Sequence, residues 1–289
     1  MNDLDIHQII SEYMYNLNDI INLYYLDKNH KNYIRIHNII DIKYSHKLNF
    51  TKNILEQEKY KYIKKLNCEE ASGINQCGII NATNLNYLKI TNNEKIIDIS
   101  HMILLKNLKC NKMINQNQIM NLINLKKLNL FDNNNINDLN HLEKLEKLKC
   151  GFSRSIHQKA IMNLINLKYL DIQYNQNIND VNHLQNLKKL DCSGLCGVNQ
   201  NGIKDLVNLE SLNINFNKTI IDINHMVKLK KLQCCGITNM KQEGFKKLVN
   251  LKVLYIIFSN QSYDLSHFKN LKKLYTCDCD DGFDLSKDK

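Results

Sequence analysis

The chain has 289 residues, a formal net charge of +10, ten cysteines, and neither proline nor tryptophan. The positive charge favours acidic partners over basic ones. The sequence opens without a basic segment followed by an apolar run, and it has no stretch of about 18 apolar residues. We therefore expect neither a signal peptide nor a membrane span.

Residues 1–60 show the apolar spacing of short helices. The first helix is expected around Ile9 and the second around Ile20, after the N-cap pair Asn18-Asp19. A third helix is expected over about residues 28–37. The simplest interpretation is a small helical domain that caps the first repeat of the segment that follows, because the apolar edge of that repeat would otherwise face water.

The same segment resembles a degenerate F-box over residues 4–40. The residues that carry the resemblance are Leu4-Asp5-Ile6, Ile9-Ile10, Tyr13-Met14, Asp19-Ile20, Leu23, Leu26 and Lys28. In that family a Leu-Pro pair opens the first helix, whereas Asp5 stands here in place of the proline and the usual tryptophan is absent. The resemblance implies an adaptor of a cullin-type ubiquitin ligase that binds a Skp1-type subunit. The implied interface is Leu4, Ile9, Ile10, Ile20 and Leu23.

From residue 61 to 289 the chain repeats one six-residue frame, L-x-x-L-x-[C/I/L]. Copies begin at Ile63, Leu85, Leu105, Leu125, Leu145, Leu167, Leu187, Leu209, Leu229, Leu251 and Leu271, in steps of 20 or 22 residues. A period of about 20–29 residues with this pattern is typical of leucine-rich repeats. The frame predicts an α/β fold: a right-handed leucine-rich repeat solenoid with a parallel concave sheet of about 11 strands. The whole chain also resembles the Asn- and Ile-rich leucine-rich repeat proteins of giant DNA viruses.

Two kinds of repeat alternate, so the true unit is a pair. The sixth position is cysteine in one kind, at Cys68, Cys110, Cys150, Cys192 and Cys234. It is aliphatic in the other, at Ile90, Leu130, Ile172, Ile214 and Ile256. The first kind resembles the cysteine-containing repeats of F-box proteins, and segments such as residues 202–208 predict a short helix on its convex side. The second kind resembles the repeats of phosphatase regulators and bacterial internalins, and it predicts a tight 3₁₀ or irregular turn.

Three columns of recurring polar or sulfur-containing residues are expected to be structural. Asp98, Asp138, Asp180, Asp222 and Asp264 each stand three residues before a histidine, and Asn93, Asn133, Asn175 and Asn217, with Ser259, follow the aliphatic strands. Copies on every second turn lie roughly 10 Å apart at about 4.8 Å per strand, which is too far for one metal ion. The cysteine column is too widely spaced for disulfides. Buried thiols of this kind favour a reducing compartment, the cytoplasm (of the host, if the chain is viral) or the nucleus.

No sequence motif predicts catalysis. The chain has no Gly-rich phosphate loop, no G-x-S-x-G and no H-E-x-x-H. The segment Cys277-Asp278-Cys279 is a weak metal signal, because no second pair accompanies it. We expect a protein that is not an enzyme and that binds no cofactor or metal.

Lysine is concentrated at the strand frame, where the second and third positions hold fourteen lysines in twenty-two places. We predict a partner-binding concave face made by Lys127, Lys147, Tyr169, Lys189, Lys231, Tyr255 and Lys273. An acidic protein is the expected partner, although lysine also solubilises an array rich in leucine and isoleucine. Three functions remain open: a ligase adaptor, a stand-alone scaffold with a capping N-terminus, and a nucleic-acid-binding module. The last is the weakest, because the aromatic residues are too scattered for a stacking platform.

Overall fold

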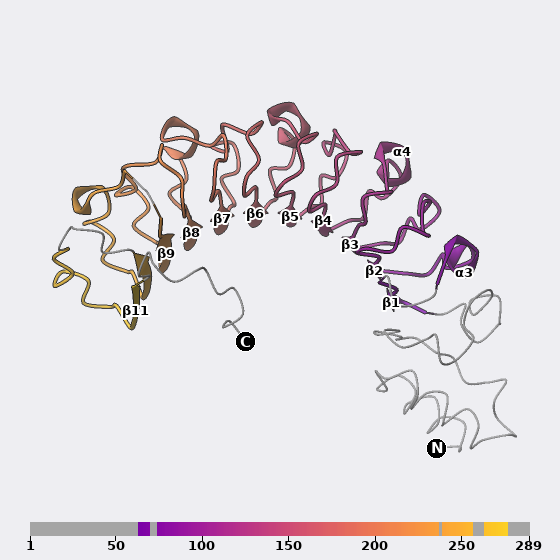
Figure 1. The fold of residues 1–289 in the computed structure, drawn as a ribbon, viewed down its shortest axis with the longest axis horizontal. Helices are drawn as coiled ribbons and strands as arrows, with labels where there is room; N and C mark the ends of the chain where they lie inside the picture. Colours follow the sequence, from indigo (N-terminus) through magenta and orange to yellow (C-terminus); the bar gives the residue numbers. More distant parts are fainter. Residues whose placement is uncertain (1–62, 70–73, 237–238, 257–262, 277–289) are drawn as a thin grey trace, which may run out of the picture. The chain divides into compact units, whose positions relative to one another are not determined.

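The computed structural model describes residues 63–69, 74–236, 239–256 and 263–276. It is an eleven-stranded parallel sheet in which the strands keep their order along the chain (Figure 1). The predicted F-box-like interface of Leu4, Ile9, Ile10, Ile20 and Leu23 lies outside the described residues, as does the expected domain boundary near residue 60. The chain divides into two compact units within the repeats. The first unit ends at Leu145 and the second begins at Glu146.

The first unit contains four of the described strands and two one-turn α-helices. The strands are β1 (Lys65–Asn67), β2 (Tyr87–Lys89), β3 (Asn107–Lys109) and β4 (Lys127–Asn129). The helices are α3 (Gln76–Ile79) and α4 (Gln116–Ile119). Asn75 and Asn115 cap these helices, each accepting a backbone N–H of the first turn with its side chain.

The second unit contains seven of the described strands and three 3₁₀ helices. The strands are β5 (Lys147–Lys149), β6 (Tyr169–Asp171), β7 (Lys189–Asp191), β8 (Ser211–Asn213), β9 (Lys231–Cys234), β10 (Val253–Ile256) and β11 (Lys273–Thr276). The 3₁₀ helices are η5 (Gln158–Ile161), η6 (Asn201–Ile203) and η7 (Gln242–Gly244).

The predicted frame sets the register in both units. Fourth-position leucines align from strand to strand, as in the pairs Leu66↔Leu88 and Leu170↔Leu190. The first, fourth and sixth positions point into the core, whereas the third and fifth point away from it, because side chains alternate along a strand. Leu187, Leu190 and Cys192 of one repeat are each at most 2% exposed. The predicted leucine-rich repeat fold is therefore confirmed.

The predicted alternation on the far side of the repeats is also confirmed, but the helices are shorter than expected. Each described helix follows a cysteine-type strand, and the aliphatic-type strands β2, β4, β6 and β8 are followed by turns. The helix predicted over residues 202–208 is only the single turn η6, and residues 204–208 form turns instead. The turns pack too closely to leave room for a longer helix. A Cβ on Gly202, for example, would collide with the carbonyl oxygen of Asn179 in the preceding turn.

Leu274 departs from the frame. It occupies the fourth position but is 43% exposed, and every residue of β11 is exposed. Its strand pairs with β10, and the described part of the chain offers no further turn to cover its other side. Among the described residues no helix is long or apolar enough to cross a membrane.

Candidate binding surface

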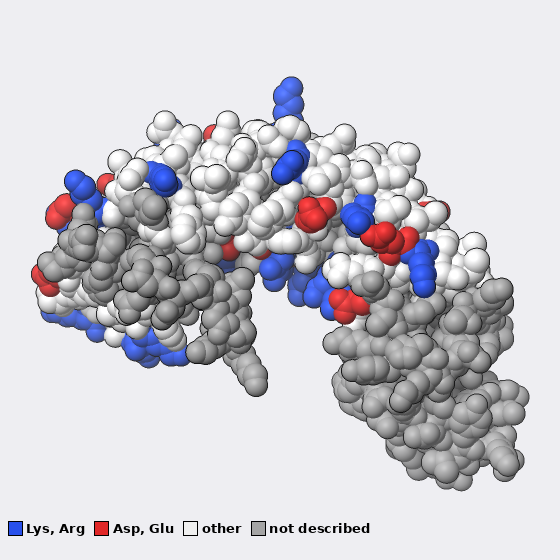
Figure 2. Space-filling model, in the orientation of Figure 1, with Lys and Arg blue, Asp and Glu red and all other residues white. Residues whose placement is uncertain are grey.

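The predicted partner-binding residues all lie at the third or fifth position of a described strand, on the face turned away from the core. We call the third and fifth positions together the sheet face. Lys127 belongs to the first unit, and Lys147, Tyr169, Lys189, Lys231, Tyr255 and Lys273 belong to the second. Figure 2 shows blue side chains on the side of the molecule where Figure 1 draws the strands. The structure therefore places these residues on one kind of surface within each unit.

The second-position lysines lie outside the strands, so the fourteen enriched lysines do not all belong to the sheet face. These residues come just before the strands, and their carbonyl groups accept the first N–H bonds of the next strand, as Lys188 does from Glu210 and Ser211. Two of their side chains are neutralised at close range: Lys168 Nζ lies 2.9 Å from Glu146, and Lys230 Nζ lies 2.6 Å from Glu210. They form a partly neutralised row at the amino ends of the strands.

Two aromatic clusters fix lysines on the sheet face of the second unit. Lys147 Nζ lies 4.3 Å from the ring centroid of Tyr169, and Lys231 Nζ lies 4.9 Å from that of Tyr255. Tyr255 stacks on Tyr275 with 4.3 Å between the centroids. Each such cation–π contact is worth about 0.5–1 kcal/mol at an exposed site. The lysines are held over rings rather than left to move freely, which reduces the entropy they would lose on binding a partner.

Two carboxylates on the same face were not predicted. Asp171 and Asp191 occupy fifth positions on the paired strands β6 and β7. Asp171 is only 2% exposed and lies 3.4 Å from Lys149 Nζ. Asp191 accepts hydrogen bonds from Ser193, at 2.6 Å from its hydroxyl, and from Asn213 at 2.9 Å. The lysine enrichment lies at the second and third positions, so it gives no signal for the fifth position, where Lys149 is followed by Asp171 and Asp191.

The pKa of the buried member of this pair is shifted. Burial raises the pKa of Asp171, repulsion from Asp191 raises it further, and Lys149 opposes both effects. Burial is also the first cause that raises the pKa of Tyr169, which lies beside this carboxylate. Perturbed carboxylates of this kind occur at functional sites and also in structural ion-pair networks.

An exposed apolar row follows the carboxyl ends of β5 to β8. We call it the aromatic ledge, and its members are Phe152, Tyr174, Leu195 and Phe216, which are 39%, 44%, 63% and 42% exposed. The backbone ladder continues into it, since the N–H groups of Phe152, Tyr174 and Phe216 donate to the next turn. Phe152 and Tyr174 stack with 4.6 Å between their centroids. Four consecutive turns thus present a large apolar side chain at one edge of the second unit.

The three aromatic residues of the ledge adopt a conformation that their type disfavours. Their φ angles are +60°, +56° and +59°. The equivalent position in other turns holds Asn92, Asp132, Gly194 or Gly236, which tolerate positive φ better. A left-handed conformation costs other residues roughly 1–2 kcal/mol each.

Two glycines make room for the ledge. A Cβ on Gly194 would lie 2.7 Å from the ring of Tyr174, and one on Gly236 would collide with the ring of Phe216. Each ring therefore leans over the glycine of the following turn. The aromatic side chains and the glycines beside them form one arrangement, which the repeat frame alone does not require.

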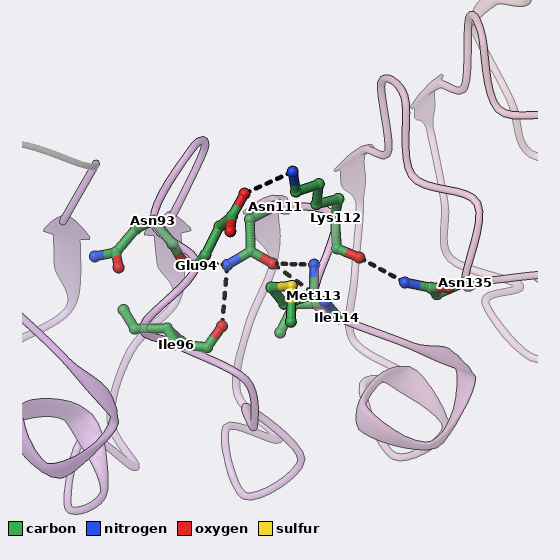
Figure 3. A network of polar contacts seen from close by, with 8 residues as sticks. All are labelled: Asn93, Glu94, Ile96, Asn111, Lys112, Met113, Ile114 and Asn135. Atoms are coloured by element: carbon green, nitrogen blue, oxygen red, sulfur yellow. Dashed lines mark hydrogen bonds and ion pairs between the residues drawn. The ribbon is translucent and has the colours of Figure 1, made fainter.

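The first unit has a hollow of about 870 Å³ beside the ends of β2 to β4, lined by residues such as Asn93, Glu94, Asn111 and Phe131. Figure 3 shows that its polar groups hold the turns together. Asn111 donates to the carbonyls of Asn93 and Ile96, and its own oxygen accepts the N–H of Met113 at 2.8 Å.

One ion pair borders this hollow. Lys112 Nζ lies 2.7 Å from Glu94, and the hydrogen bond that Lys112 donates to this carboxylate raises the pKa of Lys112. Both side chains are exposed, so the pair contributes little to stability. The polar contacts of the hollow support the turns, and we assign no chemistry to it.

The recurring polar columns are structural, as predicted. Asp180 accepts the N–H of Asn182 at 2.8 Å, and His183 Nε2 lies 3.2 Å from the carbonyl oxygen of Ile161 in the preceding turn. Asn175 donates to Ser153 and Ile156 and accepts from Asn177. The other described copies make equivalent bonds, except that Nε2 of His267 is buried without a hydrogen-bond partner. Ser259 lies outside the described residues, as do Cys277 and Cys279. Across the described residues, no group of three or more His, Cys, Asp or Glu could hold a metal ion.

The cysteine column is buried, also as predicted. Its five members are at most 6% exposed. Burial raises the pKa of Cys68, Cys110 and Cys150, and it raises that of Cys234 to about 12. These thiols act as small apolar groups. Cys192 differs from the others, because a second cysteine interacts with it.

Three solved structures share this fold. An internalin (InlF) from Listeria monocytogenes gives a TM-score of 0.59 at 19% identity, over 85% of this chain and 81% of that one. The functional domain of InlJ from the same organism, which includes a cysteine ladder, gives 0.55 at 20% identity, over 75% of this chain and 54% of its own. A leucine-rich repeat protein from Leptospira interrogans gives 0.54 at 18% identity, over 83% and 84%. No protein-family model matches the chain, and the comparison with curated proteins finds no match.

Proposed function

We propose that this chain is a protein-recognition scaffold and that its second unit binds an acidic protein partner. The observation that carries the proposal is the aromatic ledge, in which Phe152, Tyr174 and Phe216 are exposed at positive φ beside the sheet face. Strained conformations that are retained at the surface tend to mark functional sites. The same turn forms elsewhere in the chain with asparagine, aspartate or glycine, so the fold does not need the rings.

The charges around the ledge support an acidic partner. Lys147, Lys149, Lys189 and Lys231 lie on strands β5 to β9, against the two carboxylates of the same strands. One carboxylate, Asp171, is nearly buried and faces Lys149. Exposed aromatic rings next to a lysine-rich sheet face form the kind of patch in which a few aromatic anchors carry most of the binding energy. Complementary carboxylates on the partner would steer association and fix its orientation.

Nucleic acid is a weaker ligand for the same surface. Two rings of the ledge, those of Phe152 and Tyr174, already stack on each other, which leaves less face for a base. Stacking on exposed rings is what single-stranded nucleic acid needs.

The test is capture of partners by the full chain and by variants of the ledge. We expect Tyr174→Asn/Phe216→Asn to lose an acidic partner that the parent chain retains, because asparagine suits the backbone but removes the rings. The matched control is Ile165→Asn/Val207→Asn, which removes two exposed apolar side chains outside the ledge. Retention by the ledge variant, or equal loss by the control, would contradict the proposal. Displacement by single-stranded DNA instead of poly-glutamate would favour the nucleic-acid alternative.

A more specific role as an adaptor of a cullin-type ubiquitin ligase is supported by the F-box resemblance of residues 4–40. This role would place the chain in the cytoplasm or nucleus. The full chain would bind a Skp1-type subunit, and Leu4→Asp/Ile20→Asp would abolish that binding by burying unpaired charges. If the parent chain does not bind the subunit and the variant lowers the melting temperature, residues 1–60 are a cap and the scaffold stands alone.

A further inference from the structure

Two cysteines flank the turn that follows β7. Cys192 is the buried sixth-position residue of its repeat, and Cys196 lies four residues later with partial exposure. No other cysteine-type repeat has a cysteine four residues after its sixth position: the equivalent residues are Ser72, Ile114, Arg154 and Thr238. The frame needs Cys192 as a small apolar group, but it does not need Cys196.

The turn brings the second cysteine back to the first. Cys196 Sγ donates to the carbonyl oxygen of Cys192 at 2.9 Å, and the two side chains also hydrogen-bond to each other. Gly194, at φ +73°, makes the reversal possible. Gly197 then passes against the preceding turn, where a Cβ would collide with the carbonyl oxygen of Gln176. The reversal at Gly194 and the close packing at Gly197 therefore fix the path of the turn.

A buried amide holds the same pair from the next turn. Asn217 Nδ2 lies 3.5 Å from Cys196 Sγ, and it donates to the carbonyl oxygens of Cys192 at 3.2 Å and Val198 at 3.1 Å. A donor directed at sulfur stabilises the thiolate form. The pKa of Cys196 is lowered, most by the hydrogen bond from the Cys192 thiol and then by the backbone of Val198 and the amide of Asn217, whereas burial opposes this shift. The same thiol contact and burial raise the pKa of Cys192.

We infer that Cys192 and Cys196 are a disulfide-forming pair, oxidised by hydroperoxides, in the turn beneath the aromatic ledge. Cys196 is the nucleophile, because it is the partly exposed member and has donors directed at its sulfur. Its thiolate attacks one oxygen of hydrogen peroxide; the O–O bond breaks, hydroxide leaves and takes a proton to become water, and Cys196 carries a sulfenic acid. The sulfur of Cys192 then attacks the sulfenic sulfur, an S–S bond forms, and the thiol proton and the hydroxyl group leave as a second water.

The pair can be followed in the full chain by mass spectrometry. Tryptic cleavage after Lys189 and Lys204 gives one peptide that contains these two cysteines and no other. After treatment of the folded chain with hydrogen peroxide, we expect this peptide to lose two hydrogen atoms and to resist iodoacetamide until it is reduced. The matched control is the peptide from Cys150 to Arg154, with one equally buried cysteine, which should keep its thiol.

Two variants separate the roles of the pair. Cys196→Ser should leave Cys192 reduced, and Cys192→Ser should leave a sulfenic acid on Cys196 that reacts with dimedone. If the second variant fails to fold, the first, at a partly exposed position, still tests the inference. Intact thiols in the parent peptide at a peroxide concentration that oxidises the exposed Cys77, or sulfinic acid on Cys196 without a disulfide, would overturn it.

Discussion

Replacing Asn175 with alanine should destabilise the second unit far more than replacing its neighbour Asn177. Asn175 is 2% exposed and makes three hydrogen bonds, to Ser153 at 2.9 Å, to Ile156 at 3.1 Å and from Asn177 N at 2.8 Å. A net contribution near 1 kcal/mol for each bond gives a loss of about 3 kcal/mol, and alanine also leaves two buried carbonyls and one N–H without partners.

Asn177 provides the matched control. Its side chain makes one bond, to the carbonyl oxygen of Arg154 at 2.7 Å, in exposed surroundings. Water can replace that bond, so Asn177→Ala should cost about 0.5–1 kcal/mol. Urea titrations of both variants, followed by circular dichroism, give the two differences in the free energy of unfolding. Equal losses, or a loss below about 1 kcal/mol for Asn175→Ala, would refute the assignment of the asparagine column to the fold.

Three further predictions concern the strands and the ledge. Leu190→Ala should cost roughly 2–5 kcal/mol and Lys189→Ala about 0.5 kcal/mol or less in the same titration, and equal losses would reverse the assignment of inner and outer positions. Because the folded-state pKa of Asp171 is raised above its ordinary value of 3.8, its stabilising contribution is present at low pH and is lost as pH rises through the folded pKa. Asp171→Asn should therefore raise the melting temperature more at pH 7 than at pH 3, and a uniform shift would contradict the assigned charge. Gly194→Ala should cost at least about 1–2 kcal/mol of stability, because the residue has a positive φ. Any stability lost beyond this through the clash with the ring of Tyr174 should be partly recovered by adding Tyr174→Ala, which removes that ring. A double-mutant cycle measures this coupling.

The fold could be predicted because it depends on a strict period. Leu148, Leu170 and Leu190 are in register as the frame requires, since a slip of one residue would turn every core side chain outward. The structural role of the polar columns could be predicted for a related reason. Groups such as Asp180 and His183 recur on alternate turns, and each bonds to the backbone of its own or the preceding turn.

The candidate site was predicted only in part, because its carboxylates and its aromatic ledge do not recur from turn to turn. Lys147, Lys189 and Lys231 were found through lysine enrichment, a signal that repeats along the chain. Asp171, Phe152 and the other ledge residues occupy positions whose residue type changes from turn to turn. Neither the positive φ of the aromatic ledge residues nor the burial of Asp171 can be recognised from the amino-acid sequence alone. One available signal was overlooked: Gly194 and Gly236 align with Tyr174 and Phe216 in the repeat frame.

Several departures from the repeat pattern gather in one part of the second unit. Aromatic residues at positive φ, a buried carboxylate facing a second one, and a paired rather than single cysteine all occur on the turns that begin with strands β5 to β8. In a solenoid each turn packs mainly on its neighbours, so a turn that abandons the local rule loses stability there and gains none elsewhere. Several independent departures on consecutive turns are therefore better explained by a shared surface than by drift in separate repeats. Local rules that fail together are expected at functional or strained sites, and on this ground we propose that the ledge, its lysines and the thiol pair beneath it form one functional region.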